Sequence, residues 1–435
     1  MDASSCNTPL AVEFVKHCAV LGHDLREAMQ ADGATRMLEV PTLDDFRPFL
    51  ASTRTERARR AHDFYNPGIA ARRRLGQGLH DRGEASVFAS GDLSDTDRAG
   101  LAHHLPLHVK AISVAHCVVS AGSTWDVSVR GAAWGLDDME ELYVVLNLGT
   151  LVLERGARLV VRGNVFVCLC QRLIVRDPAS DGYQIGILPT PFPVDFGSGP
   201  TDGTNGEPGR DGVDGADGRT IDTEACMLGM IAREEPDPAV LCGQAGESGG
   251  DGTDGRRGRN GGMCKLAEIT VRELEGPLTV FARAGRGGDG GDGGAGGDGG
   301  DGGRGFAGPR LVSGKLADGS GGVAGHGGRG GDGGRAGGGG IASNIYIDVS
   351  EHARGRVRCD SRGSEPGAPG LGGAGGDGGR PGVADCAQMG GMAGRPGRVG
   401  AEGARGRSRP GPWMFVNGRL AHHIGADDGL LVTTA

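Results

Sequence analysis

Glycine recurs at every third residue in six separate runs of this 435-residue chain, and this period limits how its C-terminal half can fold. The runs span residues 203–218 (run 1), 243–261 (run 2), 285–308 (run 3), 319–340 (run 4), 367–382 (run 5) and 391–406 (run 6). A flexible linker needs glycine content but no register, so the constant phase indicates ordered structure. A three-residue period is typical of the polyproline II conformation, whose backbone makes no hydrogen bonds to itself. Each run must therefore bond to another segment.

Two assemblies satisfy that requirement: three chains wound as collagen, or extended glycine helices of one chain packed side by side. Collagen needs imino acids at its X and Y positions, whereas these runs are short, poor in proline and often read Gly-Gly-X. We therefore favour a bundle of about six polyglycine II helices over a collagen-like assembly. Runs 3 and 4 carry much of a second glycine phase, which predicts that they lie inside, with runs 1, 2 and 6 outside.

Glycine is expected wherever two such helices touch, because only a residue without a Cβ lets backbones approach closely enough to exchange amide hydrogen bonds. The structural glycines predicted on this ground are Gly203, Gly206, Gly209, Gly246, Gly249, Gly252, Gly288, Gly291, Gly294, Gly328, Gly331, Gly373, Gly376, Gly394, Gly397 and Gly400.

The first 105 residues are patterned like helices. Phe14 and Cys18 can share one apolar face with their neighbours, and a second helix is expected to start at Thr42 with acidic residues in its first turn. The segment 54–74 is dense in arginine. It is either a basic patch for an acidic partner or a solvated helix face, and we favour the solvated face because most charge runs are of that kind.

Short apolar or alternating stretches follow between residues 109 and 175 and predict successive strands. Gly149, Gly156 and Gly163 recur every seven residues between four of them, which favours a small β-solenoid or a tightly turned meander. Further strand-like stretches at 264–282 and 341–349 are expected to flank the glycine runs.

The sequence thus predicts a mixed fold in four parts. These are a helical N-terminal module (1–105), a β-rich solenoid-like segment (106–196), a polyglycine II bundle with flanking strands (197–410), and a C-terminal hairpin and tail (411–435). In the last part, Asn417-Gly418 is the favoured type I′ turn. If that hairpin is exposed, its binding candidates are Trp413, Phe415 and Asn417. If it is buried, the hairpin is a lid that closes the bundle, and we favour the lid.

The residues give no catalytic assignment. His103, His104, His108, His422 and His423 have no acidic or thiol partner at ligand spacing, so loop positions are favoured, and no metal or cofactor is expected. The aspartates of run 3 invite comparison with calcium-binding repeats. However, consecutive ones recur every ~9.3 Å on an extended helix, too far apart to share one ion, so a solvated or arginine-paired stripe is favoured. Cys168 and Cys170 are expected to be buried thiols.

Charge and hydropathy exclude several classes of protein. The net charge of −9 argues against nucleic acid as a partner. The longest unbroken apolar stretch, 165–170, is far short of a membrane span, so no transmembrane segment is expected. The first ten residues lack the basic and apolar regions of a Sec signal peptide. The ten cysteines contain no CxxC pair, so reduced thiols are expected.

With its six in-phase runs of Gly-X-X and Gly-Gly-X, the chain resembles the receptor-binding adhesins of T-even-type phage tails over about half its length. The resemblance implies a rigid glycine-rich scaffold whose end loops bind a surface receptor, glycan or protein, and an extracellular or virion-surface location. The leading hypothesis is therefore a non-enzymatic structural or adhesive protein. The alternatives are a self-associating filament or shell subunit, and an enzyme or toxin with its active site in residues 1–195.

Overall fold

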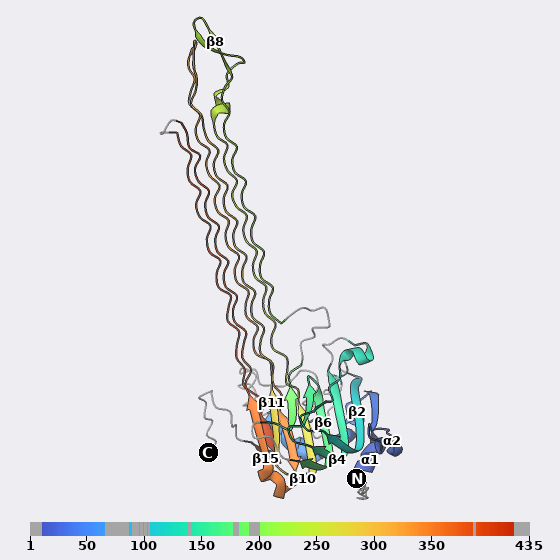
Figure 1. The fold of residues 1–435 in the computed structure, drawn as a ribbon. Coiled ribbons are helices and arrows are strands. Elements are labelled where there is room, and N and C mark those ends of the chain that lie inside the picture. The colour runs from blue at the N-terminus through green and yellow to red at the C-terminus, as the bar shows by residue number, and fades with distance from the viewer. Residues whose placement is uncertain are drawn as a thin grey trace.

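The computed structural model describes residues 11–65, 87–88, 95, 99, 102, 105–136, 141–176, 182–190, 201–385 and 389–421, without the side chains of residues 61–65. Two β-sheets and the main helices lie at one end of the molecule, and a long shaft of extended chain segments projects from them (Figure 1).

The larger sheet has eight strands in the order β1-β2-β4-β6-β10-β14-β16-β17. Its interior strands pair in parallel, whereas β1 pairs with β2, and β17 with β16, in antiparallel fashion. The bounds are β1 (Ala34–Val40), β2 (Leu107–Val119), β4 (Leu142–Leu153), β6 (Val165–Val175), β10 (Ala267–Glu275), β14 (Ile345–Val349), β16 (Met414–Val416) and β17 (Arg419–Leu420).

The smaller sheet has five parallel strands in the order β15-β11-β7-β5-β3. These are β3 (Thr124–Asp126), β5 (Arg158–Arg162), β7 (Ile185–Leu188), β11 (Leu278–Arg283) and β15 (Val357–Arg362). Each follows a strand of the larger sheet in the chain, so the polypeptide passes from the larger sheet to the smaller one five times. Each such pair of strands stacks on the previous pair. The apolar residues between the sheets form the main core, with Leu146, Leu159 and Ile269 fully buried.

The N-terminal segment covers the outer face of the larger sheet. It contains α1 (Val12–Val20), α2 (Leu25–Ala28), α3 (Leu43–Phe46), a 3-10 turn (Arg47–Phe49) and α4 (Arg54–Tyr65). Thr42 caps α3 by accepting a hydrogen bond from Asp45. Phe46 packs edge-on against Tyr143 of β4, and a second apolar cluster forms between these helices and the sheet. Short 3-10 turns also occur at Gly131–Trp134, Pro238–Leu241 and Glu351–Arg356.

The β-strands are longer than the sequence pattern predicts. Stretches expected to be separate strands, such as 143–145 and 151–153, belong to the single strand β4. Gly149 therefore lies inside a strand rather than in a turn, and it is needed there because a Cβ would come within 2.3 Å of the carbonyl oxygen of Ala115 on β2. Gly156 and Gly163 do occupy turns, with φ of +69° and +68°.

The glycine runs are inserted between strands. Runs 1 and 2 lie between β7 and β10, runs 3 and 4 between β11 and β14, and runs 5 and 6 between β15 and β16. Each pair leads away from the sheets and returns, and together the six runs form the shaft (Figure 1).

The fold class expected from the sequence is therefore wrong. The sequence predicts a helical N-terminal segment, a short-strand solenoid or meander and a polyglycine II bundle in succession. The chain instead has an α/β architecture built on an eight-stranded mixed sheet and a five-stranded parallel sheet, with 13% helix. The N-terminal segment is not a separate helical module, because its strand β1 completes the larger sheet. Strands that follow the glycine runs, such as β10 and β14, pair with β6 and with each other.

Candidate binding surface at the tip of the shaft

Backbone hydrogen bonds join the six runs into two layers. Runs 1, 3 and 5 lie parallel in one layer and runs 2, 4 and 6 in the other, as in the bonds from Gly206 to Asp292 (2.7 Å) and from Gly252 to Arg329 (2.8 Å). Bonds between the layers join antiparallel runs, as from Gly291 to Arg256 (2.8 Å). Runs 3 and 4 lie in the middle of their layers. A middle run is flanked on both sides within its layer, so a second row of glycines is needed to avoid contact with the additional neighbour.

All sixteen glycines named from the sequence lie in this shaft. Each donates its N–H to a carbonyl oxygen of a neighbouring run at 2.7–3.0 Å. A Cβ added at any of them would come within 2.2 Å of a backbone oxygen of another run. Real Cβ atoms do not come that close to another atom, so these positions fix the spacing between runs and make the shaft a rigid support.

Aspartate side chains within each layer bond to the next run. The Oδ1 of Asp211 in run 1 accepts the N–H of Asp298 in run 3 (2.9 Å), whose own Oδ1 accepts the N–H of Asp377 in run 5 (2.7 Å). These bonds satisfy backbone N–H groups of non-glycine residues that would otherwise lack a partner in the shaft. In the other layer, Asp332 accepts the N–H of Ala401, and this bond, followed by the contact with Arg329, lowers the pKa of Asp332.

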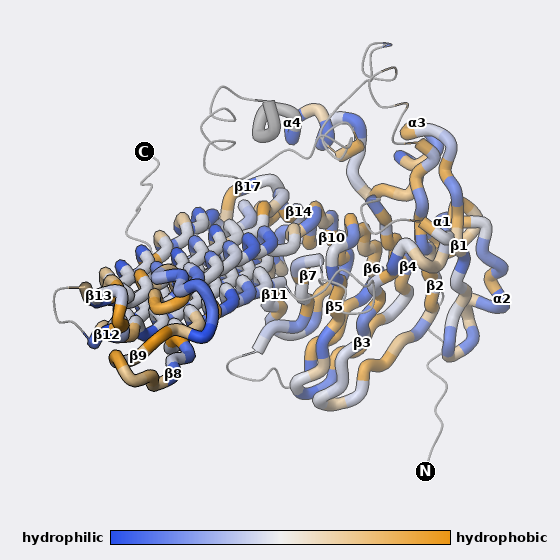
Figure 2. The backbone as a smooth tube through the Cα atoms, turned by 90° about the horizontal axis from the view of Figure 1, so that it is seen from above, coloured by the Kyte–Doolittle hydropathy of each residue, from blue (hydrophilic) through white to orange (hydrophobic). Residues whose placement is uncertain are grey.

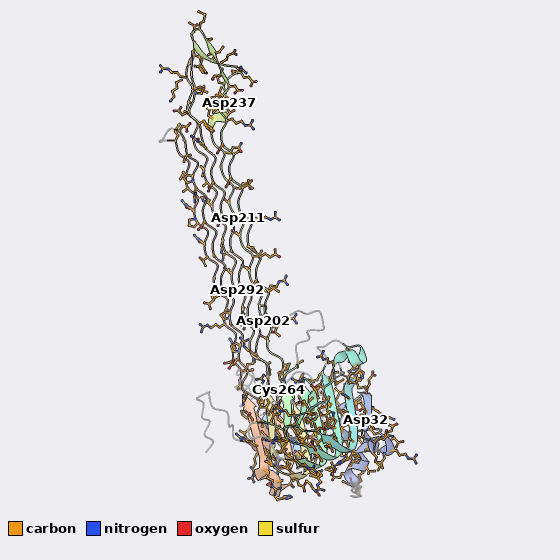
Figure 3. All side chains as sticks on the ribbon, viewed as in Figure 1. Asp32, Asp202, Asp211, Asp237, Cys264 and Asp292 are labelled. Carbon is orange, nitrogen blue, oxygen red and sulfur yellow. The ribbon has the colours of Figure 1, made fainter. Side chains whose placement is uncertain are left out.

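The aspartate stripe thus has a structural role that the sequence reading did not anticipate. Figure 3 shows Asp202, Asp292 and Asp211 at successive heights on the shaft, in that order away from the sheets. No group of three or more His, Cys, Asp or Glu side chains that could hold a metal ion occurs among the described residues.

The far end of the shaft carries two short hairpins. One consists of β8 (Thr223–Cys226) and β9 (Gly229–Ala232), and the other of β12 (Arg310–Leu311) and β13 (Gly314–Lys315). The second hairpin supports the first, because the N–H of Val312 bonds to the carbonyl oxygen of Met230 at 2.9 Å.

Apolar side chains at this end are exposed. Met227 is 104% exposed and Leu228 85%, and both lie in the turn between β8 and β9. Met230, Ile231, Val240 and Val312 add further apolar area, between 40% and 49% exposed. Figure 2 shows hydrophobic segments at β8, β9 and β12. We call residues 219–242 and 306–318 the tip.

The base of the tip is tied to the shaft. Arg304 pairs with Asp385 at 2.6 Å and lies over the ring of Phe306, whose N–H bonds to the carbonyl oxygen of buried Leu241. The first tip segment, 219–242, carries five carboxylates and two arginines, a formal charge of −3, and has no aromatic residue. The second tip segment, 306–318, adds Arg310, Lys315 and Asp318, so the whole tip has a formal charge of −2. The tip is therefore an apolar apex with a small net negative charge, held on a firm base.

The C-terminal hairpin named from the sequence lies at the other end of the molecule. Phe415 is 5% exposed and stacks on Tyr346 within the apolar cluster of the larger sheet, and Trp413 packs against the same cluster. Asn417 forms the turn between β16 and β17, where its side chain accepts the N–H of Val349 and donates to Glu351. The hairpin ends a sheet and presents no exposed aromatic surface.

A buried histidine, His23, contacts the hydroxyl of Ser113 at a site that the sequence pattern did not indicate. The Nδ1 of His23 lies 2.6 Å from the Oγ of Ser113, next to Asn147 and Cys18. His23 is 6% exposed and Ser113 is fully buried, so a substrate has no access to this pair. Burial, followed by the charge of Arg36, lowers the pKa of His23 to about 4.

The other candidates for chemistry also lie in structural positions or beyond the described residues. His108 stacks edge-on with Trp134, while His103, His104, His422 and His423 lie outside the described residues. Cys168 and Cys170 are buried, as expected, and burial raises the pKa of Cys170 to about 12. A thiol with so high a pKa is a poor nucleophile at neutral pH.

The arginine-rich segment is only partly solvated. Arg60 is buried and contacts both Glu268 of β10 and Asp348 of β14, the latter at 3.0 Å, and it lies over the ring of Tyr346. Arg57 is buried beside it. Favouring a solvated face was therefore wrong for these two residues, and residues 66–74 lie outside the described ranges. Helical periodicity could have indicated this, because Arg57 and Arg60, three residues apart, share one face of α4, the face that packs on the sheet.

In the described part of the chain, no helix is long and apolar enough to cross a membrane. No protein-family model matches the sequence, and no curated protein or solved structure is significantly similar to it.

Proposed function

We propose that this protein is a non-enzymatic adhesive or structural protein, in which the shaft holds the tip away from the sheets for contact with another protein. The observation that carries the proposal is the near-complete exposure of Met227 and Leu228 at the end of a rigid support. Exposed apolar groups gathered in one place are typical of interaction sites. Flexible methionine side chains also adapt to an apolar partner surface.

The chemistry of the tip favours a protein over a glycan or an anionic membrane. Segment 219–242 has no aromatic ring to stack on a sugar, and the one aromatic residue of the tip, Phe306, lies against Arg304 at its base. The formal charge of the tip, −2, is repelled by anionic lipid. An apolar pocket bordered by basic groups is the complement that fits both the apolar apex and the negative charge of the tip.

The double variant Met227→Asp/Leu228→Asp tests the proposal. Fluorescently labelled full-length protein is applied to intact cells and envelope fractions of the source organism, with phosphatidylcholine vesicles in parallel. The variant should bind at least about tenfold more weakly, equivalent to about 1.4 kcal/mol. Its thermal unfolding should be unchanged, because both side chains are exposed.

The matched control is Val213→Asp/Val399→Asp, which adds the same charges at exposed valines on the sides of the shaft, 65% and 69% exposed. It should bind like the wild type. Equal binding by tip variant and wild type would refute the proposal. Binding to the vesicles would refute the choice of a protein partner.

A further inference from the structure

The two layers of the shaft present outward side chains of opposite net charge. On the layer of runs 1, 3 and 5, the outward stripes, extended to the flanking residues 202 and 365, carry ten carboxylates against three arginines, a formal charge of −7. We call this the acidic face, formed by Asp202, Asp211, Asp214, Asp217, Asp289, Asp292, Asp298, Asp301, Glu365 and Asp377, with Arg286, Arg304 and Arg380.

On the outward stripes of runs 2, 4 and 6, extended to residue 407, six arginines oppose three carboxylates, a formal charge of +3 with histidine neutral. We call this the basic face, formed by Arg257, Arg329, Arg335, Arg395, Arg398 and Arg407, with Asp251, Asp254 and Asp332. The six arginines are exposed.

Hydrogen bonds set these charges in rows. Asp211, Asp298 and Asp377 lie side by side at one height of the acidic face, because each bonds to the next. On the basic face the N–H of Arg395 in run 6 bonds to the Nδ1 of His326 in run 4. Three residues further along both runs, Arg398 lies beside Arg329 in the same way. Both faces therefore offer charges at the same triplet spacing on a rigid backbone.

The edge of the shaft at runs 5 and 6 is unsuited to adding another run. Within each layer, acidic side chains reach forward to the N–H groups of the next run. The outward stripe of run 5 has a single aspartate, Asp377, beside Ala368, Leu371 and Ala374, and that of run 6 has mostly arginine and alanine and no carboxylate. An added run at this edge would find few acceptors, so contact between shafts is favoured at the faces and not at this edge.

We infer that the basic face of one copy docks on the acidic face of a second copy, so that shafts associate side by side. The second copy supplies the complementary charge with the matching spacing. A polyanion is the other occupant that arginines would suit, but the chain carries a net charge of −9, which opposes its approach. Because two different faces meet, a pair still has one free acidic face and one free basic face, on different copies, so the association is open-ended. This inference does not depend on the tip.

Sedimentation of the full-length protein over a range of NaCl concentrations provides the test. Between about 0.01 M and about 1 M salt, the screening length falls from roughly 30 Å to roughly 3 Å. Association between charged faces should therefore be strong at low salt and at least about tenfold weaker at high salt. A wild type that stays monomeric at low salt overturns the inference.

Two face variants locate the contact. Arg329→Glu/Arg398→Glu reverses one row of the basic face, and Asp211→Asn/Asp298→Asn/Asp377→Asn removes one row of the acidic face while keeping the Oδ1 acceptors. Neither should self-associate at low salt. Mixed together, they should form one-to-one pairs and nothing larger, because only one compatible pair of faces remains. Mixtures that stay monomeric, or that form long assemblies, overturn the inference.

The matched control is Arg256→Glu/Arg259→Glu, which makes the same charge change on the edge of run 2. It should associate like the wild type. If the face and edge variants associate equally, the faces are not the contact. If heparin binds the basic face of a wild type that never self-associates, the occupant is a polyanion and the inference fails.

Discussion

At the scale of single residues, the buried polar groups report most directly on stability. His23 lies against Ser113 under α1 and α2, with its pKa lowered to about 4 by burial and by Arg36. In the folded protein it is neutral at pH values where an unfolded chain, with a pKa of 6.5, would already bind a proton.

Folding stability should therefore fall as the pH falls from 6.5 toward 4, because protons bind preferentially to the unfolded state. The contribution of His23 is fully present above pH 6.5. A His23→Gln variant should show a flatter dependence of Tm on pH in this window, measured by calorimetry. Identical slopes for variant and wild type would show that His23 does not titrate on unfolding.

Arg60 links α4 to the larger sheet through Glu268 and Asp348. Within the described residues, replacing it with methionine leaves the buried Glu268 carboxylate bonded to the backbone N–H groups of Ala51 and Ser52 and to no cation. We expect Arg60→Met to lower the free energy of unfolding by about 3–5 kcal/mol, measured by denaturant titration. The control Arg59→Met, at the exposed next-door position, should change it by less than about 1 kcal/mol. Similar losses for both would show that the buried ion pairs of Arg60 are not the cause, since arginine and methionine have nearly equal helix propensity.

At the scale of elements, the close packing of the runs makes adjacent glycines unequal. A Cβ on Gly249 would lie 2.0 Å from the carbonyl oxygen of Gly297, whereas the nearest atom to a Cβ on Gly250 is 3.2 Å away. Gly249→Ala should therefore destabilise the shaft by about 1–3 kcal/mol, and Gly250→Ala by much less. Hydrogen exchange of the run 3 amides measures this difference. Equal protection in the two variants would contradict the tight fit.

Part of the structure follows from local sequence signals. Gly156 and Gly163 mark turns, Asn417-Gly418 forms the expected hairpin turn, and Thr42 begins a helix. These features depend on a few neighbouring residues. Gly149 shows where such reasoning fails, because its glycine is required by the carbonyl oxygen of Ala115 on another strand. A spacing of seven residues cannot distinguish a turn from a crowded strand interior.

The larger errors arose from contacts between distant segments. The partner of Arg60, Glu268, is 208 residues away, and the aspartates of run 3 bond to residues 87 positions earlier. The residues around each strand do not predict that the strands after the glycine runs pair into the same two sheets. Of the candidate site, binding by end loops came only from the resemblance to phage adhesins and stays a prediction, and the exposure of Met227 and Leu228 required the structure.

At the scale of the whole molecule, the tip and the N-terminal segment contribute differently. The tip ends in exposed side chains, whereas residues 11–60 cover an apolar face containing Tyr143 and Tyr346. Replacing residues 223–232 with a short turn should leave Tm unchanged within about 2 °C, since exposed groups contribute little to stability. Calorimetry of this variant beside the wild type is the measurement. A large drop in Tm would mean that the tip is part of the folding unit.

The lateral bonding of the runs also bears on how such a molecule could change its length. Each run keeps its partners triplet by triplet, so three extra residues in run 3 alone would misplace every bond beyond the insertion. Lengthening requires matching additions at the same height in all six runs. The distance between the sheets and the tip is thus set by all six runs together, and no single insertion or deletion can change it.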